Sequence, residues 1–76
     1  MHKVVLYHTQ GCHLCEQAYE LLLHFFSPAE VNCIDIVDDE AMMNLYQCDI
    51  PVAQNCLTQA LLKWPFNPQQ IQEVLK

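Results

Sequence analysis

A change in hydrophobic period at Gly11 constrains the fold of this 76-residue chain more than any other feature of its sequence. Before it, Val4-Val5-Leu6-Tyr7 is the short β-branched and aromatic run of a strand buried on both faces. After it, apolar residues recur at helical spacing, with polar residues on the other side. The chain is therefore expected to pass from a strand directly into a helix, which Ser27-Pro28 ends because proline cannot continue it. The apolar residues of this helix are Leu14, Ala18, Leu21, Leu22 and Phe25.

The middle of the chain predicts three shorter elements. Residues 31–37 have the alternation of a second strand. The acidic residues 38–40 suit the start of a short helix, because carboxylates are stabilised at the positive end of the helix dipole. Residues 51–54 and 58–62 predict a hairpin that turns at Asn55-Cys56.

The end of the chain carries the clearest boundary signals. Asn67 can cap a helix that begins at Pro68, and Gln70 stands where a capping box requires Glu or Gln. Phe66 and Ile71 have the spacing of a hydrophobic staple. These signals predict a final helix whose buried stripe contains Ile71, Val74 and Leu75.

The element order is β-α-β-α-β-β-α, which indicates the α/β class. A strand-helix-strand unit forms a parallel pair with a right-handed crossover, and the hairpin adds antiparallel strands. The expected architecture is a mixed four-stranded sheet with helices on both faces. A chain of this length can bury only about 60% of its unfolded surface, so residues 1–76 are expected to form a single domain.

Charge and hydropathy exclude several classes of partner. Nine Asp and Glu residues stand against three Lys and no Arg, which gives a net charge of −6. Nucleic acids and anionic membranes are both recognised largely through Lys and Arg, so neither is an expected partner. No apolar run approaches the ~20 residues of a membrane span. The apolar start of the chain is too short for a secretory signal.

The cysteine count indicates a reducing compartment. Five cysteines are an odd number for a secreted disulfide framework, and the chain is also rich in apolar residues. We therefore expect a cytoplasmic protein in which one pair of thiols carries chemistry. Of the other three, Cys33 is expected as a small core residue within a strand, Cys48 in a packing role and Cys56 exposed at the hairpin turn.

That pair is Cys12 and Cys15, at the start of the first predicted helix. The unpaired N–H groups and the dipole at a helix start stabilise a thiolate. Side chains three residues apart on a helix lie about 5–6 Å apart at Cβ, somewhat beyond a relaxed disulfide, so a bond between them can form and remain reducible. The position therefore favours reversible redox chemistry.

Three segments carry a resemblance to a known family. Residues 8–15, His-Thr-Gln-Gly-Cys-His-Leu-Cys, resemble the active-site segment of glutaredoxins and thioredoxins. Residues 49–52, Asp-Ile-Pro-Val, resemble the loop that carries the cis-proline of those proteins. Residues 62–67, Leu-Lys-Trp-Pro-Phe-Asn, resemble a tail segment of small bacterial glutaredoxin-like proteins. The resemblance implies a thioredoxin-like, glutaredoxin-like fold.

It also implies a thiol–disulfide oxidoreductase. Cys12 would attack a substrate disulfide as a thiolate, and Cys15 would displace the reduced product. His13, Ile50 and Pro51 would contact the substrate, with a cis peptide bond between the last two. The expected partners are protein or small-molecule disulfides, the expected cofactor is none beyond the Cys12–Cys15 disulfide, and the protein is expected to be a monomer.

The sequence departs from glutaredoxins in ways that bear on glutathione. Their cysteines usually enclose Pro and Tyr, where this chain has His13 and Leu14. Trp64 and Phe66 occupy the region in which glutaredoxins have Gly-Gly. The chain also lacks the Arg that would form a bidentate bond with a carboxylate of glutathione. Glutathione is therefore expected to be at most a weak co-substrate.

Two further interpretations of the cysteine pair stay open. One is a non-catalytic binding module that keeps the thioredoxin fold. The other is a metal or iron–sulfur carrier, for which a cluster could be bridged between two copies through Cys12. His8 and His13 are the only local additional ligands for zinc, and they would make a poor structural site, so no metal site is assigned.

Overall fold

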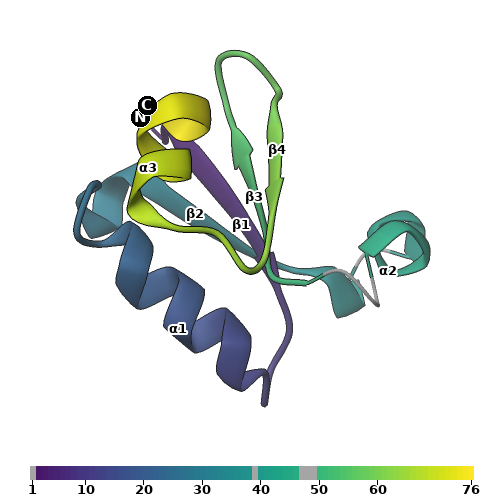
Figure 1. Ribbon diagram of the computed structural model, residues 1–76. Helices are drawn as coiled ribbons and strands as arrows, with labels where there is room; N and C mark the ends of the chain where they lie inside the picture. The colour runs from purple at the N-terminus through teal and green to yellow at the C-terminus, as the bar shows by residue number, and fades with distance from the viewer. Residues whose placement is uncertain (1, 39, 47–49) are drawn as a thin grey trace.

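The elements follow one another in the predicted order (Figure 1). The computed structural model describes residues 2–38, 40–46 and 50–76. Short 3₁₀ turns precede and follow the second strand, and the last helix continues as a π-helical turn. The elements are β1 (Val4–His8), α1 (His13–Leu22), η1 (Pro28–Glu30), β2 (Val31–Asp35), η2 (Ile36–Asp38), α2 (Glu40–Tyr46), β3 (Val52–Asn55), β4 (Leu61–Lys63), α3 (Pro68–Gln70) and η3 (Ile71–Leu75).

The four strands form one mixed sheet in the order β2-β1-β3-β4. β1 pairs parallel with β2 and antiparallel with β3, and β3 pairs antiparallel with β4. The parallel pair follows from the α1 crossover, since parallel neighbours cannot be joined by a tight turn. The predicted mixed four-stranded sheet is confirmed, and β2 is one of its edge strands.

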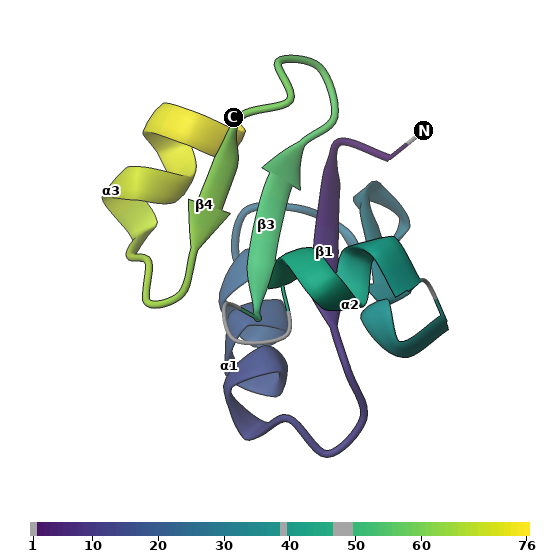
Figure 2. The ribbon, with the colours of Figure 1, turned by 90° about the vertical axis from the view of Figure 1, so that its right-hand side faces the viewer.

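Helices cover both faces of the sheet, as predicted. α1 and α3 lie on one side and α2 lies on the other (Figures 1 and 2). Side chains of β1 alternate between the two sides, so Val4 and Leu6 pack under α1 and α3, whereas Tyr7 packs on the α2 side. The larger cluster also includes Ala18, Leu22, Phe26, Val31, Ala53, Leu62, Phe66, Ile71 and Leu75.

Two predicted strand boundaries were wrong. β2 ends at Asp35 and not at Val37, because the Val37 N–H donates to Asp35 Oδ1 at 3.0 Å and turns the backbone into η2. Ile36 remains buried, against Tyr7. β4 begins at Leu61 rather than at residue 58, because the chain is still turning through residues 56–58.

α1 also ends earlier than the apolar pattern predicts. Its last residue is Leu22, and the chain then forms tighter turns in which Phe25 N–H donates to Leu22 O at 2.9 Å. These turns keep Phe26 buried in the larger core cluster. The apolar period therefore continues past the helix, since a 3₁₀-like turn can present the same face.

The predicted cap of the last helix is confirmed. The N–H of Gln70 donates to Asn67 Oδ1 at 2.8 Å, and the N–H of Asn67 donates to Gln70 Oε1 at 3.0 Å. Phe66 and Ile71 are both buried in the same cluster. Among the described residues, no helix has the length and apolar character of a membrane span.

Asn55 ties the end of β3 to the end of the chain. It is 7% exposed, and its Nδ2 donates to Val74 O at 3.0 Å. Its Oδ1 accepts from the N–H groups of Leu57 and Thr58, at 2.8 and 3.1 Å. These three bonds satisfy a buried amide and hold the β3–β4 turn against the last helical turn.

Candidate active site

Cys12 and Cys15 are joined in a disulfide at the start of α1, with their Cα atoms 5.2 Å apart. Cys12 is the N-cap residue, and its Sγ accepts a hydrogen bond from the N–H of Cys15 at 3.1 Å. A sulfur atom thus occupies the position in which helices usually place a hydroxyl or carboxylate oxygen. Negative charge on this sulfur would meet both a backbone donor and the positive end of the helix dipole.

The two cysteines differ in accessibility. Cys15 is 4% exposed and belongs to the core, whereas Cys12 is half-buried. A substrate in solution can therefore reach the sulfur of Cys12 before that of Cys15. This asymmetry suits one attacking and one resolving thiol.

Gly11 provides the backbone turn that places Cys12 at the helix start. Its φ is +76°, in the left-handed region that side chains rarely adopt. A Cβ built at this position would meet no heavy atom within 4 Å. Glycine is therefore required here for its backbone conformation and not for space.

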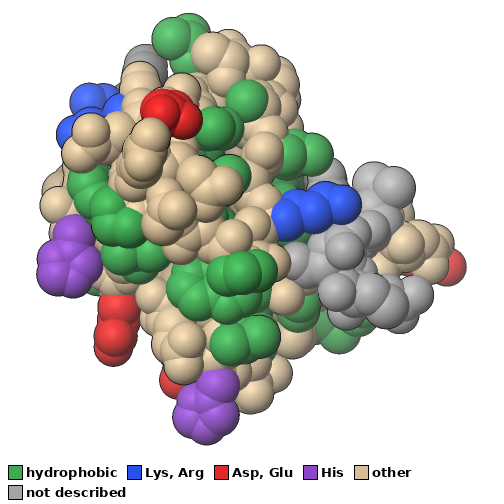
Figure 3. Space-filling view, viewed as in Figure 1, with side chains coloured by type: hydrophobic (Ala, Val, Ile, Leu, Met, Phe, Trp, Pro, Cys, Tyr) green, Lys and Arg blue, Asp and Glu red, His purple; other side chains and the backbone are tan. Residues whose placement is uncertain are grey.

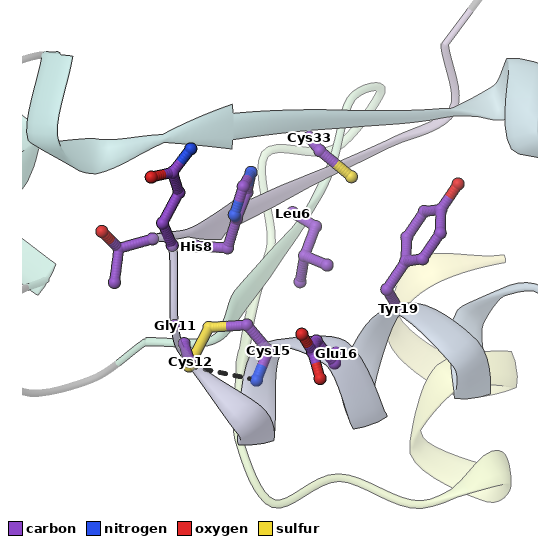
Figure 4. A pocket seen from close by; sticks show the side chains of 10 residues that line it. Leu6, His8, Gly11, Cys12, Cys15, Glu16, Tyr19 and Cys33 are labelled. Atoms are coloured by element: carbon purple, nitrogen blue, oxygen red, sulfur yellow. Dashed lines mark hydrogen bonds between the residues drawn. A yellow bond between two sulfur atoms is a disulfide. The ribbon is translucent and has the colours of Figure 1, made fainter.

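A cavity of 330 Å³ adjoins the disulfide (Figure 4). It lies between α1 and the β1–β2 part of the sheet, and the β1–α1 loop closes one end. Both cysteines of the disulfide line it, so it opens directly onto the reactive bond. The described residues that line it are Leu6, His8, Thr9, Gln10, Gly11, Cys12, Cys15, Glu16, Tyr19 and Cys33.

Cys33 corrects one prediction. It was expected in the core, but it is exposed. It pairs in register with Leu6 on the α1 face of the sheet, yet it belongs to the edge strand β2 and faces the cavity. Partial burial there raises the pKa of its thiol. It is therefore a third cysteine beside the cavity that holds the disulfide.

Tyr19 and Glu16 also line the cavity and were not identified from the sequence, and His8, which lines it too, was considered there only within the segment 8–15 and as a zinc ligand. Tyr19 follows Cys15 by four residues, which puts both on the same side of α1. His8 follows Leu6 by two residues in β1, so the two share a face of the sheet. These spacings were visible in the sequence, but they do not show that space is left between the two faces.

His13 is at the first position of α1, next to Cys12. Its side chain is 92% exposed, and its Nδ1 lies 3.5 Å from Glu16 Oε2. His13 is not among the described residues that line the cavity. It lies at the outer surface of the helix start.

Ile50 and Pro51 precede β3. Their peptide bond is cis, which confirms the prediction made for it. Pro51 is fully buried, and its carbonyl oxygen accepts from the N–H of Trp64 at 3.1 Å. A second cis bond, between Trp64 and Pro65, was not predicted.

Two of the three lysines lie away from the disulfide, and the third, Lys63, pairs in register with Val52, one residue after Pro51. Lys3 and Lys76 line a second cavity of 490 Å³ at the opposite end of the sheet. On the face drawn in Figure 3, the end of the molecule where α1 begins shows histidine and acidic side chains and no blue lysine. Among the described residues that line the disulfide cavity, none is a lysine.

Metal ligands are not grouped in the described ranges 2–38, 40–46 and 50–76. No three His, Cys, Asp or Glu side chains there lie close enough together to hold a metal ion. Cys56 lies in the turn after β3, as predicted, although it is half-buried rather than exposed. Cys48 falls outside the described residues.

Comparisons with known proteins place the chain among glutaredoxin-like sequences. Residues 3–76 match the family described as "Glutaredoxin-like domain (DUF836)". The chain is also similar to the X-ray structure of the structural-genomics target protein XcR50 from X. campestris, with 29% identity and a TM-score of 0.78. That similarity covers 92% of this chain and 91% of the other. No curated protein matches the sequence.

Proposed function

The chain belongs to the glutaredoxin-like domain family (DUF836), and from that premise we propose that it is a dithiol–disulfide oxidoreductase acting through Cys12 and Cys15. The observation that carries the proposal is the N-cap sulfur. Cys12 Sγ accepts the N–H of Cys15 at 3.1 Å while it is bonded to the partner with which it would exchange. The same sulfur is accessible and, once reduced, would be stabilised as an anion by this donor and by the helix dipole.

The exchange proceeds in two displacements. In the reduced protein, the Cys12 thiolate attacks one sulfur of a substrate disulfide, and the other substrate sulfur leaves as a thiolate. The Cys15 thiolate then attacks Cys12 Sγ, which closes the Cys12–Cys15 disulfide and releases the second substrate thiolate. Two electrons pass from the dithiol to the substrate, and a thiol or dithiol donor restores the reduced form.

His13, Ile50 and Pro51 are the proposed substrate contacts beyond the two cysteines. The exposed imidazole of His13 is adjacent to Cys12 in the chain and can meet a substrate as it approaches. The backbone of Ile50, just before β3, would hold an extended substrate segment, with Pro51 fixing the backbone behind it.

The proposed substrates are protein or small-molecule disulfides, and no cofactor beyond the Cys12–Cys15 disulfide is invoked. Glutathione is proposed as a weak co-substrate, because its two carboxylates would meet a cavity lined by Glu16 and by no described lysine. We place the protein in the cytoplasm as a monomer.

A non-catalytic binding module and a cluster carrier are the competing functions. A cluster bridged through Cys12 would give visible absorption in freshly purified protein, and a binding module would show no exchange. Both readouts are obtained from the same preparation that is used to assay disulfide reduction.

The decisive experiment replaces the two cysteines separately. Cys12→Ser is expected to abolish reduction of bis(2-hydroxyethyl) disulfide. Cys15→Ser is expected to accumulate a mixed disulfide at Cys12 that is visible by mass spectrometry, because the resolving thiol is absent. Cys56→Ser, in the turn at the other end of the sheet, is the matched control and should keep the activity. Equal alkylation of Cys12 and Cys15 by iodoacetamide at mildly acidic pH would contradict the assigned roles.

A further inference from the structure

The cavity between α1 and β2 extends away from the disulfide, and the exchange steps above do not require it. Its 330 Å³ is near the lower limit of the roughly 300–1,000 Å³ typical of small-molecule sites, so it can take one long side chain rather than a folded segment. We propose that it receives the Lys or Arg side chain of a peptide disulfide substrate, one or two residues from the substrate cysteine. This inference rests on the proposed function and specifies its substrate class.

The walls suit a side chain with an apolar stem and a charged tip. Leu6 from β1 and Tyr19 from α1 face each other across the cavity, and Cys33 borders it from β2 (Figure 4). The methylene groups of Lys or Arg pack against such surfaces while the cation stays hydrated. The ring of Tyr19 can also attract the cation through its π face.

Charge selects a cation over a neutral or acidic side chain. Glu16 supplies a carboxylate to the cavity, and the titratable side chain that the adjoining strand β1 adds to the lining is His8. The Glu16 side chain is 72% exposed and its Oε2 lies 3.5 Å from Nδ1 of the exposed His13, so an entering cation would compete with that imidazole for the carboxylate. No described residue of the lining is a lysine, and the chain contains no Arg. The net charge of −6 further favours a cationic substrate during approach.

The position of the cavity sets the distance from the reacting sulfur. Cys12 and Cys15 line one part of it, so an occupant must be attached close to the disulfide being exchanged. An extended chain advances about 3.3 Å per residue, which brings a side chain one or two residues from the substrate cysteine within reach.

The cation also helps the chemistry of the second displacement. In the mixed disulfide, Cys12 Sγ is bonded to the substrate cysteine nearest the cavity. When Cys15 attacks Cys12 Sγ, that substrate cysteine leaves as a thiolate, and a neighbouring Lys or Arg lowers its pKa and speeds its departure. Two electrons reach the substrate, as in the general exchange.

The test compares peptide disulfides that differ at one position near the cysteine: Arg, norleucine or Glu. Each kcat/KM is divided by that for bis(2-hydroxyethyl) disulfide, which is too small to need the cavity. The wild-type protein is expected to favour Arg over norleucine about threefold, the range of an exposed ion pair. It should favour norleucine over Glu.

Two pairs of variants locate the effect. Cys33→Leu narrows the cavity beside Leu6 and should lower the relative kcat/KM of the Arg peptide about tenfold, as expected when one side chain loses its buried site. Cys33→Ser keeps the space and should change it less than twofold. Glu16→Gln should remove the preference for Arg over norleucine, whereas Glu20→Gln, an equal change of net charge elsewhere on α1, should keep it.

Three results would overturn the inference. The first is no preference for the Arg peptide over the norleucine peptide, and the second is a preference that survives both Cys33→Leu and Glu16→Gln. The third is a loss of relative kcat/KM in Cys33→Ser as large as that in Cys33→Leu. The second result would assign the preference to the leaving thiolate alone. Failure of the proposed function looks different, because bis(2-hydroxyethyl) disulfide would then not be reduced even by the wild-type protein.

Discussion

The two ends of β1 lie beside two different cavities. Its end at His8 adjoins the 330 Å³ cavity that contains the disulfide. Its start follows Lys3, which lines the 490 Å³ cavity together with Lys76 and Asn55. The first cavity carries reactive sulfur and a carboxylate, and the second carries lysines and a network of hydrogen bonds.

The two ends of β1 therefore differ in role: one holds the cysteine pair, and the other is stabilised by an ion pair and hydrogen bonds. At the second cavity, the Lys3 side chain pairs with Glu30 at 3.0 Å and the Lys3 backbone bonds to the backbones of both Glu30 and Cys56. The side chain of Asn55 makes three hydrogen bonds. At the first, the start of α1 is capped by a sulfur that would leave its partner in each cycle of the proposed exchange. The Cys12–Cys15 disulfide can open at one end of β1 without unfolding the domain, because the contacts of Lys3 and Asn55 stabilise the other end independently.

The largest expected effect is on stability, and it tests the end of β1 beside Asn55. Asn55→Ala should lower the free energy of unfolding by about 3 kcal/mol, because three hydrogen bonds are lost and Val74 O is left without its donor. Disulfide reduction per folded molecule should not change. Denaturant unfolding measures the first quantity and initial rates the second, with Leu57→Ala, a 91% exposed side chain in the same turn, as the control. A loss of activity per folded molecule would mean that the two ends are coupled.

An intermediate effect is expected at the other end of β1, where Gly11 leads into the cysteine pair. Gly11→Ala should lower the free energy of unfolding by about 1–2 kcal/mol, the cost of a left-handed conformation for a residue with a Cβ. Here activity should fall as well, because the same turn positions Cys12. Gln17→Ala, at an exposed position of α1 that is not among the described residues lining the cavity, is the control, and Gly11→Asn should be milder than Gly11→Ala. Unchanged activity in folded Gly11→Ala would show that the turn does not position the sulfur.

The smallest expected effect is the pH dependence of stability that arises from Glu30, beside Lys3. The pKa of Glu30 is lowered by the hydrogen bond from the Ser27 backbone N–H, at 2.9 Å, and then by Lys3. A lowered folded-state pKa gives stability that is present above the unfolded pKa, about 4.3, and is lost as pH falls through the folded value. The difference in melting temperature between wild type and Glu30→Gln should therefore shrink between pH 6 and pH 3. A difference in melting temperature that stays constant with pH would show that ionisation of Glu30 does not contribute to stability.

The local sequence pattern predicted the fold well where the spacing of neighbouring residues decides burial or capping. Val4, Leu6 and Tyr7 in β1 and the capped final helix are examples, because burial and capping are written in local spacing. It failed where a side chain redirects the backbone, as Asp35 does when it accepts from Val37 N–H. An apolar residue such as Ile36 is buried in either geometry, so the pattern cannot distinguish a strand from a 3₁₀ turn.

The candidate site was predictable in part for a related reason. The pairing of Cys12 with Cys15 follows from spacing and from the helix start, both of which are local. The position of Cys33 depends on β2 being an edge strand, which the order of strands in the sheet determines. Its register with Leu6 puts it on the α1 face, but alternation along the strand could not show that the packing there leaves a cavity.

The hydrogen bond from Cys15 N–H to Cys12 Sγ makes one amide proton a reporter of the redox state of the two cysteines. Its acceptor is a disulfide sulfur in the oxidised protein and a thiolate in the reduced one, and an ionised acceptor forms the stronger bond. The NMR chemical shift of this amide and its rate of solvent exchange would therefore follow the redox state without any added probe. Because this sulfur caps the helix, a change in its redox state would alter a backbone hydrogen bond in the first turn of α1.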